Sequence, residues 1–112
     1  MERLRRYIAE EKLDQRNRKR EVVYTRFYLA AWYKDQRPKA SLLKIGSYFN
    51  NGHDWTIHAL REYNKYKDDS MFLEYTEDVR KAFPMGIMDL GVSQSMIMFQ
   101  ILAKQNDKIL VN

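Results

Sequence analysis

Residues 41–66 read SLLKIGSYFNNGHDWTIHALREYNKY, and the predicted fold is organised around this stretch. Leu42, Ile45 and Phe49 in its first part follow one another at helical spacing. The Asn-Asn-Gly triplet at 50–52 then supplies residues that tolerate positive φ, as a sharp corner requires. The stretch therefore predicts a short helix that ends in a tight corner.

A second helix is predicted after the corner. Its buried side is expected to comprise Ile57, Ala59, Leu60, Tyr63 and Tyr66. Ser41 is a suitable N-cap for the first helix, and Gly46 lies inside that helix. Because a glycine there costs about 1 kcal/mol relative to alanine, we expect the second helix to approach closely at Gly46. This is the layout of a helix-turn-helix, whose second helix enters the major groove of DNA.

The remaining segments also favour helices over strands. The chain contains only two Pro and four Gly, with frequent Leu, Met, Lys, Arg and Glu. Further helices are predicted at residues 2–13, 22–35, 68–83 and 93–111. The helix at 22–35 is strongly apolar, and we expect it to be the central buried one. The predicted fold class is all-α, a helix-turn-helix bundle of about five to six helices.

Positive charge is concentrated in the first part of the chain. The formal net charge is +5 and the isoelectric point is near 9.5, which suggests an anionic partner. Residues 1–67 hold sixteen Lys or Arg against eight Asp or Glu, whereas residues 68–112 hold four against seven. We therefore predict a basic helix-turn-helix domain at 1–67 and a helical extension at 68–112. Ser93–Val111 is apolar enough either to pack on the domain or to bind a second copy or another protein.

Several classes of protein are disfavoured by the composition. There is no Cys, and His53 and His58 are too few to build a zinc site unaided, so no metal or other cofactor is expected. The sequence lacks the G-x-x-x-x-G-K-[ST] loop that would indicate a nucleotide-binding site. It also pairs no nucleophile with a base, so no enzymatic activity is expected. No apolar run is suited to a membrane span or a signal peptide, so we expect a cytoplasmic protein.

Three segments together resemble a known family. They are RKREVVYTR at 18–26, SLLKIGSYF at 41–49 and HDWTIHA at 53–59. From about Arg18 to Tyr66, the chain is similar to the C-terminal DNA-binding domain of the bacterial replication initiator DnaA, a Trp-repressor-like helix-turn-helix. Stand-alone domains of this type occur in bacteria and their phages.

The resemblance implies contact with two grooves of double-stranded DNA. The family's basic loop, which enters the minor groove, corresponds to Arg16, Arg18, Lys19 and Arg20. Arg26 matches an arginine that supports phosphate contact, Lys44 would add a further phosphate contact, and His53 aligns with a base-reading histidine. The expected DNA-binding residues are Arg16, Arg18, Lys19, Arg20, Arg26, Lys44, His53, Asp54, Trp55, Thr56 and Arg61.

The second helix departs from the family pattern at its start. The turn is one residue shorter, and Asp54 and Trp55 replace a Thr-Thr pair, so the family's target sequence is not transferred. Asp54 suits either a helix N-cap or an acceptor for a cytosine amino group. Trp55 suits either stacking on DNA or packing on the core, and His58 is expected to be partly buried.

Two functions remain open from the sequence. The first is binding of double-stranded DNA, as a transcriptional regulator or a replication accessory protein. The second is a phage structural or adaptor protein that uses the same fold as a scaffold for protein interaction, in which case a virion location is possible. A solvated loop is the alternative interpretation of the basic run at 14–21.

Overall fold

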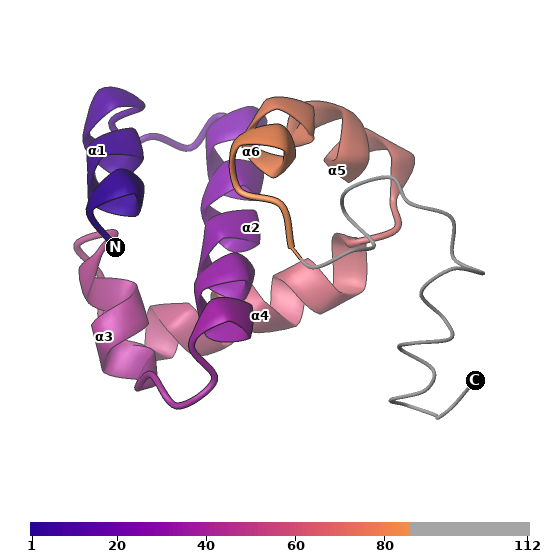
Figure 1. The fold of residues 1–112 in the computed structure, drawn as a ribbon. Coiled ribbons are helices and arrows are strands. Elements are labelled where there is room, and N and C mark those ends of the chain that lie inside the picture. Colours follow the sequence, from indigo (N-terminus) through magenta and orange to yellow (C-terminus); the bar gives the residue numbers. More distant parts are fainter. Residues whose placement is uncertain (86–112) are drawn as a thin grey trace. The chain divides into compact units, whose positions relative to one another are not determined.

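The computed structural model describes residues 1–85, and these residues form six helices and no strand (Figure 1). The helices are α1 (Glu2–Glu10), α2 (Arg20–Gln36), α3 (Leu42–Ser47), α4 (His53–Tyr66), α5 (Ser70–Tyr75) and α6 (Glu77–Ala82). The predicted all-α class, with about five to six helices, is confirmed. Met1–Val79 forms one compact unit, which includes α5 and holds every side chain discussed below. The predicted helix at Ser93–Val111 lies outside the described residues.

Helix α2 is the centre of this unit, as its apolar sequence predicted. Seven consecutive residues, Phe27–Tyr33, are buried, so this part of the helix is covered on every side. Helix α4 crosses α2 and packs against it and against α3, while α5 also contacts α2 (Figure 1). Tyr28 and Tyr63 meet edge to face across the α2–α4 contact, with ring centroids 6.2 Å apart.

The corner between α3 and α4 follows the sequence prediction closely. The Ser41 hydroxyl accepts a hydrogen bond from the Lys44 backbone N at 3.0 Å and caps α3. Asn50 has φ of 60°, the conformation expected for an Asn in a sharp turn. A Cβ on Gly46 would lie 2.5 Å from the carbonyl O of Gly52, so the expected close approach at this glycine is confirmed.

The fully buried residues of α4 are smaller than those that its apolar pattern predicted. Its fully buried residues are Thr56 and Ala59, whereas Ile57 and Leu60 are only half-buried. Short side chains are therefore found where α4 approaches α3 closely at Gly46.

The segment predicted as one helix at 68–83 forms two. Asp69 caps α5 by accepting hydrogen bonds from two backbone N–H groups at 3.0 and 3.1 Å. The helix is interrupted at Thr76, where the backbone leaves helical geometry. The Thr76 hydroxyl donates to the Phe72 carbonyl O at 2.7 Å. The first helix is also shorter than predicted: α1 ends at Glu10, and the chain turns through Lys12, whose φ is 55°.

Candidate nucleic-acid interface

The basic segment, defined as residues 14–20, is held in place by Arg26 of α2. Nε of Arg26 donates to the Leu13 carbonyl O at 2.8 Å, and Nη1 donates to the Asn17 carbonyl O at 2.8 Å. Nη2 donates to the Gln15 carbonyl O, so one guanidinium binds two carbonyls of the segment and the Leu13 carbonyl just before it. Burial lowers the pKa of Arg26. Its guanidinium holds the backbone that bears the other cations.

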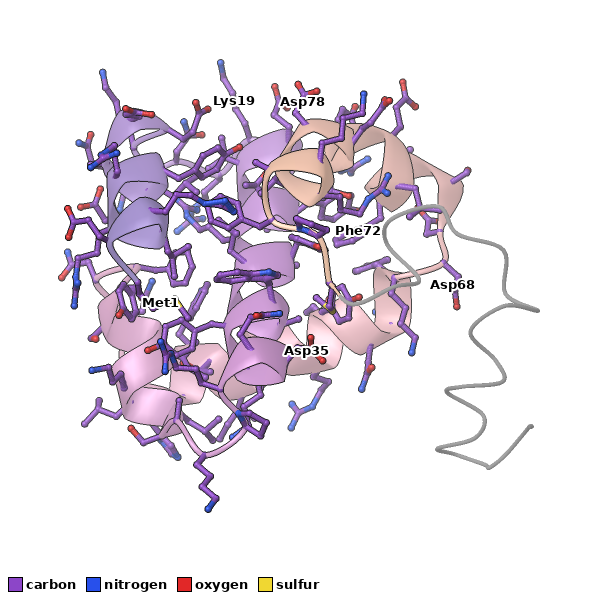
Figure 2. The ribbon with its side chains drawn as sticks, viewed as in Figure 1. Met1, Lys19, Asp35, Asp68, Phe72 and Asp78 are labelled. Atoms are coloured by element: carbon purple, nitrogen blue, oxygen red, sulfur yellow. The ribbon has the colours of Figure 1, made fainter. Side chains whose placement is uncertain are left out.

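The cations of the basic segment itself are exposed. Arg16, Arg18, Lys19 and Arg20 all belong to the exposed surface. The Lys19 backbone N donates to Oδ1 of Asn17 at 2.9 Å, which fixes the chain just before α2 begins. Figure 2 shows Lys19 at the N-terminal end of α2, with its side chain directed away from the helices. Nη1 of Arg20 donates to Sδ of Met71 on α5 at 3.1 Å. The ordered backbone thus presents exposed cationic side chains on the surface.

A groove connects the basic segment with the corner before α4. We call it the loop–corner groove; its volume is about 490 Å³, and its lining includes Asp14, Arg16, Arg18, Arg26, Asn50, Asn51 and Trp55. Three cations against one carboxylate make it electropositive. The structure therefore brings Arg16 and Arg18 together with Trp55, residues far apart in the sequence. Asn50 and Asn51, which the sequence indicated only as turn residues, add amide groups to the groove.

The start of α4 is organised differently from the prediction for Asp54. The N-cap is Gly52, which offers no side chain, and Asp54 lies within the first turn instead of capping it. The Asp54 carboxylate is 98% exposed and lies 3.2 Å from Nδ1 of His53. An exposed pair of this kind contributes little stability, so both side chains are available to a partner. Arg61, two turns further on, is exposed as well.

Trp55 contacts both the core and the groove. Its ring centroid lies 5.0 Å from that of the buried Phe49, and the indole is half-buried. The same side chain lines the loop–corner groove. The two interpretations of Trp55 are therefore compatible: one side of the indole packs on Phe49, and the remainder borders the groove.

Thr56, one of the expected DNA-binding residues, is buried and cannot reach DNA. It has 0% exposure, and its hydroxyl donates to the Leu42 carbonyl O at 2.7 Å. The expectation for Thr56 is wrong because the close contact between α3 and α4 takes up this side chain. His58, which was expected to be partly buried, is exposed instead. Its ring centroid lies 5.5 Å from that of Phe27, and the two rings are nearly perpendicular.

Replacing Thr56 with Val is expected to lower the free energy of unfolding by about 1 kcal/mol, because one hydrogen bond between α3 and α4 is lost. Urea unfolding measures this difference. Thr25→Val is the matched control, since the Thr25 hydroxyl donates at 2.7 Å to Glu21 O within its own helix, on a half-buried surface. The control should change stability by less than about 0.5 kcal/mol. Equal effects of the two substitutions would contradict the assigned contact.

Lys44 lies apart from the loop–corner groove. It lines a different groove of about 660 Å³ together with Arg5, Arg37, Lys39 and Tyr48. The guanidinium of Arg5 lies over the Tyr48 ring, 5.2 Å from its centroid. This second set of cations surrounds the end of α2 opposite to the basic segment, so Lys44 does not join the other expected DNA-binding residues.

Among residues 1–85, no cluster of three or more His, Asp or Glu side chains could hold a metal ion. The helices of this part of the chain are also too short or too polar to cross a membrane. Comparison with protein-family models, with curated proteins and with solved structures finds no match for the chain. The functional argument therefore rests on the geometry of the loop–corner groove.

Proposed function

We propose that the protein binds double-stranded DNA through the basic segment and the start of α4. The observation that carries the proposal is the loop–corner groove, where cations of the basic segment adjoin the corner that precedes α4. Arg16 and Arg18 border one side, and Trp55 borders the other. A transcriptional regulator or a replication accessory protein, with a helix-turn-helix similar to that of DnaA, is the cellular role that this mode of binding suits best.

Electrostatics supports duplex DNA as the ligand. Exposed Lys and Arg side chains neutralise phosphates and release condensed counterions, which provides affinity independent of sequence. Arg26 strengthens this effect indirectly, since it orders the backbone that bears the cations before DNA arrives. Less conformational entropy is then lost on binding. The exposed His53, Asp54 and Arg61 supply donors and acceptors for the major groove.

Replacing Arg16, Arg18 and Lys19 with Ala is expected to remove most of the affinity for duplex DNA. Fluorescence anisotropy with a mixed-sequence duplex at about 50 mM salt measures this loss. The slope of log affinity against log salt should fall by about 0.9 for each phosphate contact removed. The matched control replaces Arg3, Arg6 and Lys67, which are exposed and line none of the grooves described above. It removes the same charge and should retain most of the affinity.

Two outcomes would contradict the proposal. Equal losses in both triple variants would mean that net charge alone attracts DNA, without a defined surface. No binding of the unmodified protein to duplex at low salt would remove DNA as the partner. The adaptor function would then be favoured, because Leu43 on α3 is 61% exposed and Met71 on α5 is 41% exposed.

A further inference from the structure

Another groove adjoins the loop–corner groove. We call it the tyrosine groove; its volume is about 540 Å³, and its lining includes Arg18, Arg20, Tyr24, Glu62, Tyr66 and Tyr75. Arg18 lines both grooves, so they adjoin at this side chain. The volume falls within the range of about 300–1,000 Å³ typical of sites for small ligands.

Tyr24 is the common neighbour of the aromatic rings in this region. Its ring centroid lies 5.5 Å from that of Tyr66 on α4 and 6.1 Å from that of Tyr75 on α5. The Tyr24 ring centroid also lies 5.0 Å from that of the buried Phe72. Packing accounts for Phe72 and for part of Tyr24. Packing accounts for Tyr75 less fully, because this residue contacts Tyr24 but is still 42% exposed and lines the groove.

The charges around the tyrosine groove select an anionic ligand with an aromatic part. Arg18 and Arg20 are exposed at its edge, where they can bind phosphate, and Glu62 is half-buried and can accept a hydrogen bond from an amino group. Tyrosine rings beside such cations are the arrangement on which single-stranded nucleic acids stack. A methylated ammonium would also suit tyrosines and a Glu, but the two guanidinium groups repel it.

We propose that the tyrosine groove binds an unpaired base of single-stranded DNA, with Arg18 and Arg20 on the neighbouring phosphates. This inference rests on the proposed function only in that Arg18 would serve both grooves. The protein would then prefer a duplex that continues into a single strand over a blunt duplex. The duplex part would lie against the basic segment and the start of α4, and the first unpaired bases would reach Tyr66 and Tyr75.

The full chain is titrated by anisotropy against a blunt duplex and against the same duplex with a thymine extension of about eight nucleotides. The extended DNA is expected to bind about tenfold more tightly, within the range for one stacked base. Tyr75→Ala should abolish this difference and leave blunt-duplex affinity unchanged. Tyr75→Phe is the matched control, because it keeps the stacking ring, and it should retain the difference. A 2-aminopurine in the extension should lose fluorescence on binding to the unmodified protein and to Tyr75→Phe, but not to Tyr75→Ala.

The blunt-duplex measurement separates this inference from the proposed function. If both DNAs bind equally, or if Tyr75→Ala retains the difference, the tyrosine groove is not a base-binding site and duplex binding still stands. If the extended DNA binds and the blunt duplex does not, the inference holds and double-stranded binding is wrong. If neither DNA binds, both proposals are overturned.

Discussion

Replacing Gly46 with Ala is expected to lower the free energy of unfolding by about 2–3 kcal/mol. The added Cβ would lie 2.5 Å from the Gly52 carbonyl O and 2.9 Å from the Asn51 carbonyl O, too close for either backbone atom to remain in place. Alanine has the higher helix propensity, by about 1 kcal/mol, and this gain offsets only part of the cost. Helices α3 and α4 would have to separate at the corner.

Urea or thermal unfolding, followed by circular dichroism, measures the effect of Gly46→Ala. Gly52→Ser is the matched control, because a Cβ on Gly52 meets nothing within 4 Å and its φ of −95° suits any residue. Serine is also a good N-cap, so the control should be neutral or stabilise by a few tenths of a kcal/mol. If Gly46→Ala instead stabilises the protein, as propensity alone predicts, the close approach of α3 and α4 is not present in solution.

Replacing Arg26 with Lys is expected to lower the free energy of unfolding by about 2–3 kcal/mol and to weaken DNA binding, although the net charge is unchanged. The guanidinium donates to the carbonyls of Leu13, Gln15 and Asn17, which a single ammonium cannot match. Some of the freed carbonyls can bind water, which limits the loss of stability. The segment would then be less ordered before it meets DNA, and more entropy would be lost on binding.

Unfolding and duplex titration of the same Arg26→Lys preparation test both parts of this prediction. Arg6→Lys is the matched control, because it makes the same chemical change at an exposed position on α1. The control should change neither stability nor affinity beyond experimental error. If Arg26→Lys is destabilised but binds duplex normally, an ordered basic segment is not required for DNA binding, and only its charge matters.

Local signals in the sequence were sufficient to predict the α3–α4 corner. Ser41 is a good cap, Asn50 tolerates positive φ, and Gly46 lies where a larger residue would be preferred in an isolated helix. Each signal depends on a residue's own backbone preference, so it can be recognised without knowledge of the tertiary contacts. The same reasoning identified the all-α class and the buried central helix.

The candidate sites were predicted less completely, because they depend on long-range contacts. Thr56 has the spacing of a DNA-binding residue, but the approach of α3 makes its hydroxyl a buried donor. Arg26 has the charge of a phosphate-binding residue, but three backbone carbonyls surround its guanidinium. The break at Thr76 was missed for a local reason, since a threonine hydroxyl is compatible with either a continuous or an interrupted helix.

The sequence by itself determined the helical class, the capped corner of residues 41–52 and the basic character of residues 14–20. These properties follow from periodicity, backbone preference and charge, which are local. Only the tertiary structure decided which side chains are accessible and which meet. It buried Thr56, turned Arg26 toward the backbone of the basic segment, and joined the two grooves at Arg18, because packing of α2 against α4 and α5 brings together residues distant in the chain.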